Sequence, residues 1–196
     1  MICFVARSYS KNRERNATPA KNSQPLRVLT VRPRPGDPRL GLLRAGAMTF
    51  RCALGRSGIS ANKREGDGAT PLATMRVLGG YFRRSRFPIR SALQLGAITP
   101  DLGWCDLPAD RNYNRPVRLP YRASHEEMLR GDGLYDAVIV LDWNITPRRR
   151  GRGSAIFLHL ARPGFQPTEG CVAVSRRTMA WLLPRLSART VLKVAR

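Results

Sequence analysis

Short apolar runs separated by glycine and proline are the feature that most restricts how this chain can fold. The 196 residues include 17 glycines and 15 prolines. Within residues 48–54 apolar and polar side chains alternate, which is typical of a half-buried strand. Residues 135–143 alternate in the same way and predict a longer strand that is buried at its centre. We therefore expect a mostly β domain with turn-rich connections.

Three further strands are predicted along the chain. They cover residues 26–31, 73–78 and 190–194, each an apolar stretch bounded by polar or turn-forming residues. Gly79 and Gly80 are expected to end the second of these strands. Residues 81–122 show no regular pattern, and we expect them to be irregular.

Two short helices are predicted in the second half of the chain. Ser124 and Glu127 form a capping-box pattern, which predicts a surface helix that starts there and carries His125 in its first turn. Ser175 is a suitable N-cap for a second helix. Apolar residues recur after it at helical spacing, at Met179, Leu182, Leu183 and Leu186. Pro184 should kink or shorten this helix near its end.

The composition predicts one folded domain with a strongly basic surface. The net charge is +22, and only four of the 35 basic residues are lysines. Such a charge attracts polyanions of any kind without choosing among them, so non-specific polyanion binding is expected. Residues 1–24 are polar, basic and aperiodic, and we expect them to be disordered, with the folded domain covering residues 25–196.

The sequence limits the sites and segments that the chain can contain. It has four cysteines without a C-x-x-C pair and two histidines, so neither a zinc ribbon nor another metal site is expected. No apolar run is long enough for a transmembrane helix. The apolar start of the chain is too short for a clear signal peptide.

A histidine and a cysteine lie at the ends of neighbouring apolar runs within residues 153–175. His159 closes one run, and Cys171 opens the next after a loop with two prolines. A thiol with a pKa of about 8.5 is only slightly ionised at neutral pH, so an imidazole that accepts the thiol proton raises the reactivity of the sulfur. Gly170 frees the backbone before the sulfur, and the N–H groups of Gly170 and Cys171 could face an oxyanion. The pattern favours a cysteine acyl-transfer site, although a buried structural cysteine and a core histidine would give the same spacing.

Several blocks of the sequence resemble one enzyme family. Residues 168–171 read Thr-Glu-Gly-Cys, with His159 upstream, and residues 66–71 read Gly-Asp-Gly-Ala-Thr-Pro. Together they resemble the L,D-transpeptidase (YkuD-like) catalytic domain, and the likeness extends over roughly residues 26–194. The resemblance implies a β-sandwich of mixed sheets with a few short helices and with the cysteine in a cleft at one end.

The resemblance also implies a mechanism and a set of site residues. Cys171 would be the nucleophile and His159 its base, with the ring oriented by the main-chain carbonyl of Leu160. The substrates would be peptidoglycan stem peptides, with an amine as acceptor and no metal or organic cofactor. The expected substrate-binding residues are Ser154, Thr168, Glu169, Arg176 and Arg177.

Two departures from the family pattern bear on this site. Glu169 stands where the family commonly has histidine. A carboxylate there would favour the protonated thiol if both were buried together, or it could instead help to hold His159 in its charged state. Ala173 stands where the family commonly has arginine. Recognition of a substrate carboxylate would then fall to Arg176 or Arg177.

Two other functions remain compatible with the sequence. One is an L,D-carboxypeptidase that uses the same thiol and delivers the acyl group to water. The other is a non-catalytic, basic β domain that binds nucleic acid, although no dedicated nucleic-acid-reading motif is present. The resemblance implies work in the periplasm or cell envelope.

Overall fold

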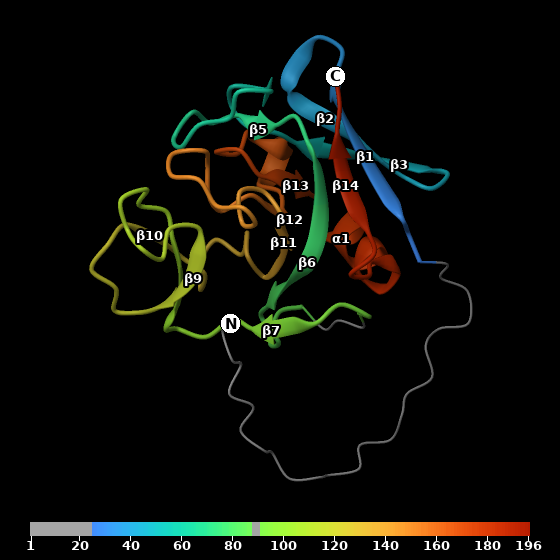
Figure 1. Cartoon of the computed structure of the whole chain (residues 1–196). Helices are drawn as coiled ribbons and strands as arrows, with labels where there is room; N and C mark the ends of the chain where they lie inside the picture. The colour runs from blue at the N-terminus through green and yellow to red at the C-terminus, as the bar shows by residue number, and fades with distance from the viewer. Residues whose placement is uncertain (1–24, 88–90) are drawn as a thin grey trace.

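The structure, a computed structural model, describes residues 25–87 and 91–196. Its main element is a nine-stranded mixed sheet that closes on itself, because β11 pairs with both β12 and β6 (Figure 1). In sheet order the strands are β11 (Ala137–Leu141), β12 (Phe157–Leu160), β13 (Val172–Val174), β3 (Met48–Ala53), β2 (Asp37–Ala45), β1 (Val28–Arg34), β14 (Val191–Val194), β6 (Thr74–Phe82) and β7 (Leu95–Ala97). β7 lies outside the closed barrel, beside β6.

The barrel interior is the main hydrophobic core, and strand alternation fills it. On β1, Leu29 and Val31 are fully buried and point inward, whereas Val28 is 46% exposed. Leu158 and Val174 on the neighbouring strands β12 and β13 point into the same core. The register of the mixed sheet is therefore fixed by which residues face inward.

The helix predicted after Ser175 is confirmed and contributes to this core. It is α1 (Arg176–Leu182), and the Ser175 hydroxyl accepts a hydrogen bond from the N–H of Thr178 at 3.1 Å. The helix passes at Leu183 into the 3-10 turn η2 (Leu183–Arg185), so it is shortened where Pro184 was expected to act. Its buried side chains join the barrel interior, namely Met179, Leu182, Leu183 and Leu186.

A second, smaller layer packs against the outside of the barrel. It is a three-stranded antiparallel sheet of β10 (His125–Glu127), β8 (Leu102–Cys105) and β9 (Arg115–Arg118), seen to one side of the barrel in Figure 1. Trp104 of β8 meets Phe157 of β12 edge to face, with ring centroids 5.1 Å apart. The described chain also has a two-stranded sheet of β4 (Ile59–Ser60) and β5 (Thr70–Pro71), and a 3-10 turn η1 (Pro163–Phe165).

The mostly β class with mixed sheets and few short helices is confirmed, but three local predictions are wrong. The segment at His125 is strand β10 rather than a helix, because its backbone pairs with β8. Residues 81–122 contain β7, β8 and β9 rather than only irregular chain. Gly79 and Gly80 do not end their strand but lie inside β6.

Gly80 marks a close approach between strands rather than a break. A Cβ on Gly80 would lie 2.1 Å from the carbonyl oxygen of Val138, so only glycine allows β11 to pair here. The prediction failed because a glycine pair in a strand pattern signals either a turn or a tight contact, and only the tertiary structure distinguishes them.

No helix among the described residues is long and apolar enough to span a bilayer. The expectation that residues 1–24 are disordered lies outside the described residues.

Candidate active site

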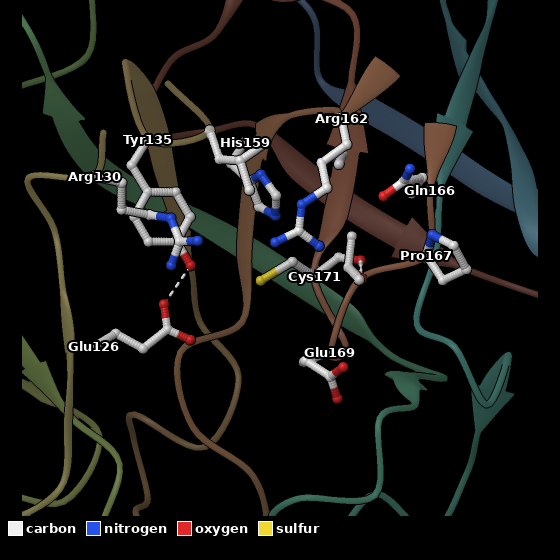
Figure 2. A pocket seen from close by; sticks show the side chains of 12 residues that line it. Glu126, Arg130, Tyr135, His159, Arg162, Gln166, Pro167, Glu169 and Cys171 are labelled. Atoms are coloured by element: carbon white, nitrogen blue, oxygen red, sulfur yellow. Dashed lines mark hydrogen bonds between the residues drawn. The ribbon is translucent and has the colours of Figure 1, made fainter. Parts of the chain in front are cut away.

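Cys171 and His159 come together because β12 and β13 are adjacent parallel strands. His159 on β12 is in register with Ala173 on β13, and Cys171 precedes Ala173 by one strand repeat. Alternate residues of a strand share a face, so all three side chains lie on the outer face of the barrel. Figure 2 shows the sulfur of Cys171 and the ring of His159 facing the same space.

This space is a pocket with a volume of about 100 Å³ between the barrel and the outer layer. Cys171 is 8% exposed and His159 is 5% exposed, so both residues are largely shielded from water, and both line the pocket. Its other lining residues are Glu126, Arg130, Leu134, Tyr135, Arg162, Gln166, Pro167, Thr168, Glu169 and Ala173.

The imidazole of His159 is held by its own strand. Its Nδ1 lies 2.8 Å from the carbonyl oxygen of Leu160, an atom that can only accept a hydrogen bond. Nδ1 therefore carries the proton, and Nε2 is left with a free lone pair. Burial lowers the pKa of His159 to about 4, so the ring is neutral and able to act as a base at physiological pH.

The thiol of Cys171 is also neutral and is bonded to the backbone. Its Sγ donates to the carbonyl oxygen of Ala155 at 3.1 Å and accepts from the N–H of Phe157 at 3.4 Å. Burial, assisted by the negative charge of Glu126, raises the pKa of Cys171 to about 12. The site thus holds a thiol and a neutral imidazole rather than a preformed thiolate and imidazolium.

The turn that carries Cys171 is fixed by Thr168 and requires Gly170. The Thr168 hydroxyl donates to the carbonyl oxygen of Cys171 at 2.7 Å and accepts from the N–H of Gly170 at 3.2 Å. Gly170 has a φ of +134°, and a Cβ there would lie 2.8 Å from the carbonyl oxygen of Ala69. The Gly170 N–H therefore points into its own turn in this conformation.

The Gly-Asp-Gly block supports this turn from below. Asp67 accepts from the N–H of Ala69 at 2.9 Å, and Ala69 contributes the carbonyl that excludes a side chain at Gly170. The hydroxyl of Thr70, the first residue of β5, accepts a hydrogen bond from the N–H of Gly55 at 2.8 Å and donates to the carbonyl oxygen of Cys171 at 3.5 Å. The block is more than a turn before a strand, because it packs directly against the turn that carries Cys171.

Of the other predicted site residues, Glu169 lies at the rim of the pocket and Ser154 lies outside its lining. The side chain of Glu169 is 74% exposed and paired with Arg56 at 2.8 Å. In Figure 2 it points away from the sulfur, so this carboxylate is not buried together with the thiol. Ser154 is buried outside the pocket lining and donates to Glu65 at 2.8 Å.

Neither Arg176 nor Arg177 lines the pocket. Arg176 binds the carboxylate of Asp136 and the carbonyl oxygen of Arg86, which ties the start of α1 to its surroundings. Arg177 is exposed in the first turn of the same helix.

Four titratable residues of the pocket were not predicted from the sequence, namely Glu126, Arg130, Tyr135 and Arg162. The Tyr135 hydroxyl donates to Glu126, and burial raises the pKa of that carboxyl group. Glu126 was hidden by the capping-box pattern that predicted a helix. Arg162, which follows the histidine strand, offered a usable signal, since a basic residue so close to a candidate base is expected near the site.

Arg130 and Arg162 give the pocket a cationic side. Arg162 reaches toward the space between His159 and Cys171 in Figure 2, and its charge contributes to the lowered pKa of His159. Arg130 is paired with Asp132 at 2.6 Å and stacks over the ring of Tyr135 at 5.2 Å. Across residues 25–87 and 91–196, no group of three or more His, Cys, Asp or Glu side chains could hold a metal ion.

Comparison with known proteins identifies the family. The family model of the L,D-transpeptidase catalytic domain, YkuD, matches residues 37–194. The chain therefore belongs to this enzyme family, whose members act on peptidoglycan and are generally associated with the cell envelope. No curated protein and no solved structure matched the chain.

Proposed function

We propose that this protein is a cysteine acyl transferase that acts on peptidoglycan stem peptides as an L,D-transpeptidase. The observation that carries the proposal is the shared pocket of Cys171 and His159, in which Nδ1 is occupied by Leu160 and Nε2 is free. This is the arrangement that a thiol nucleophile and its base require. Membership of the family supplies the substrate class.

The acylation step follows from the neutral resting pair. The Cys171 thiol turns from the carbonyl of Ala155 toward His159, and its proton passes to Nε2 as sulfur attacks the peptide carbonyl carbon. The carbonyl oxygen becomes an oxyanion that the N–H of Cys171 stabilises, joined by that of Gly170 if it leaves Thr168. The C–N bond then breaks, the leaving amine takes the proton from Nε2, and a thioester remains on Cys171.

The second step uses the same groups in reverse. An acceptor amine attacks the thioester carbon and gives a proton to Nε2, and the C–S bond breaks to release the new amide. The departing sulfur regains its proton from His159. Water in place of the amine would give hydrolysis and a carboxypeptidase activity.

The cationic side of the pocket supports binding of a substrate carboxylate. Because Ala173 leaves no guanidinium at the position common in the family, we assign this role to Arg162, with Arg130 as a second positive charge. This replaces the assignment to Arg176 or Arg177, since those residues lie outside the pocket lining. We place the protein's site of action in the cell envelope, as for the family in general.

Product analysis tests the proposal. The purified protein is incubated with a disaccharide tetrapeptide from peptidoglycan, with and without a second stem peptide as amine acceptor, and the products are measured by mass spectrometry. We expect a cross-linked product that has lost the terminal residue of the donor, and none with Cys171→Ser. Loss of the terminal residue without cross-linking would instead identify a hydrolase. No change in the donor would contradict both.

A further inference from the structure

A buried lysine lies below the catalytic turn and takes no part in the proposed chemistry. Lys63 is 2% exposed, although it carries a primary ammonium group. The other described lysine, Lys193, is exposed on β14. Burying an ammonium group is unfavourable unless partners compensate for its lost hydration, so its position requires an explanation.

Two glycines make room for the Lys63 side chain. A Cβ on Gly170 would lie 3.5 Å from Cε of Lys63, and a Cβ on Gly153 would lie 3.1 Å from the same atom. Gly170 precedes the nucleophile, and Gly153 begins the segment that leads into the histidine strand. The lysine stem therefore passes between the two chain segments that form the active site.

The charged end of Lys63 is held by the Gly-Asp-Gly loop. Its Nζ donates to Asp67 and, at 2.7 Å, to the carbonyl oxygen of Arg64. Asp67 also accepts from the N–H groups of Arg64 at 2.7 Å and Ala69 at 2.9 Å. The ion pair thus organises the loop whose Ala69 carbonyl contacts Gly170.

We propose that Lys63 is a positioning residue for the nucleophile. It places a buried positive charge next to the Gly170–Cys171 turn, and together with Asp67 it fixes the loop that supports this turn. A positive charge near the sulfur favours the thiolate over the thiol. In a weakly screened interior this effect is larger than that of a surface charge. Lys63 thereby opposes Glu126, which favours the thiol.

The inference rests on the proposed function only in taking Cys171 as the nucleophile. The titratable and charged groups in the pocket lining around the thiol are Glu126, Arg130, Tyr135, His159, Arg162 and, pointing away from the sulfur, Glu169, and Lys63 lies outside this lining. Any test must therefore compare single substitutions in an otherwise unchanged pocket.

The experiment measures alkylation of Cys171 by iodoacetamide between pH 6 and pH 9 in the full-length protein. Peptide mapping separates Cys171 from the other cysteines, and Cys171→Ser supplies the blank. Below the pKa of the thiol, the rate is proportional to the thiolate fraction, so a rise of one unit in that pKa lowers the rate about tenfold. We expect Lys63→Met to lower the rate by roughly three- to tenfold across this range, and Lys193→Met to leave it unchanged.

Asp67→Asn distinguishes a role of charge from one of structure. It keeps an oxygen acceptor for Lys63 but removes the opposing charge, so the rate should stay the same or rise up to about threefold. Thermal melting of each variant checks that it is folded. An unchanged rate in folded Lys63→Met would overturn the inference, and so would an equal slowing in both variants. Neither result depends on whether peptide substrates are cross-linked, so failure of the proposed function would be seen separately.

Discussion

Glu126 and Lys63 carry opposite charges and shift the pKa of the Cys171 thiol in opposite directions. Glu126 lies in the pocket wall, and its negative charge contributes to the raised pKa of Cys171. Its carboxyl group is held by the Tyr135 hydroxyl. Burial is the largest cause of the raised pKa of Cys171, and the balance between these two charges adds to it or reduces it.

Replacing Glu126 should therefore make the thiol more reactive. We predict that Glu126→Gln lowers the pKa of Cys171 and speeds alkylation by iodoacetamide at pH 8 by roughly three- to tenfold. The matched control is Glu127→Gln, which removes an exposed carboxylate from the next position of β10. Equal rates in the two variants would show that Glu126 does not influence the sulfur.

At the scale of the elements, the site depends on the pairing of β12 with β13 and on the packing of the outer sheet against them. Parallel pairing of β12 with β13 puts His159 and Cys171 on one face, and the outer sheet covers that face. Asn114, next to β9, joins these layers because its Oδ1 accepts from both Trp104 Nε1 and the N–H of Ala155 at 3.0 Å. Ala155 in turn supplies the carbonyl that binds the thiol.

Closure of the barrel should depend on the absence of a side chain at Gly80. A methyl group on Gly80 would lie 2.1 Å from the Val138 carbonyl oxygen and would push β6 away from β11. We predict that Gly80→Ala lowers the free energy of unfolding by about 2–3 kcal/mol. Gly131→Ala, where a Cβ meets nothing within 4 Å, should change it by less than about 0.5 kcal/mol in the same urea titration. Similar midpoints for both variants would contradict this account of closure.

For the whole molecule, the buried neutral His159 should limit stability in acid. Its pKa is lowered from 6.5 to about 4 in the folded state, so the unfolded chain binds more protons between these values. Stability from this group is present above pH 6.5 and is lost as the pH falls toward 4, up to about 3 kcal/mol in total.

Urea titrations from pH 7 to pH 4 measure this loss. The raised pKa of Glu126 acts in the opposite direction in acid, so the wild type is compared with His159→Gln, which removes only the histidine. We expect the difference in unfolding free energy between the two proteins to narrow as the pH falls. A difference that is constant over this range would show that His159 is not buried in its neutral form.

The pairing of Cys171 with His159 could be predicted from the sequence, but the residues that surround them could not. Cys171 and His159 could be paired because both lie at the ends of apolar runs that are close in the chain. The carbonyl of Leu160 was expected from the family and is found at Nδ1. Local sequence favoured a helix at Glu126, and strand pairing with β8 overrode it, so the carboxylate that acts on the thiol was missed.

The architecture was predicted to a similar extent. The alternation in residues 48–54 and the cap at Ser175 were correctly interpreted, because both signals are local. The closing pair β6–β11 depends on contacts between segments far apart in the chain, which no local pattern contains. The same is true of Lys63, whose burial depends on glycines in two distant segments.

The most direct test of the central claim is the rate at which a β-lactam acylates Cys171, measured by intact-protein mass spectrometry with and without the imidazole. If His159 takes the thiol proton, His159→Ala should slow acylation by at least about 100-fold. Substitution of the other histidine, His125→Ala, should leave the rate unchanged, since that residue lies on β10 outside the pocket. Acylation at the same rate in folded His159→Ala and wild-type protein would contradict the claim that these two side chains work together.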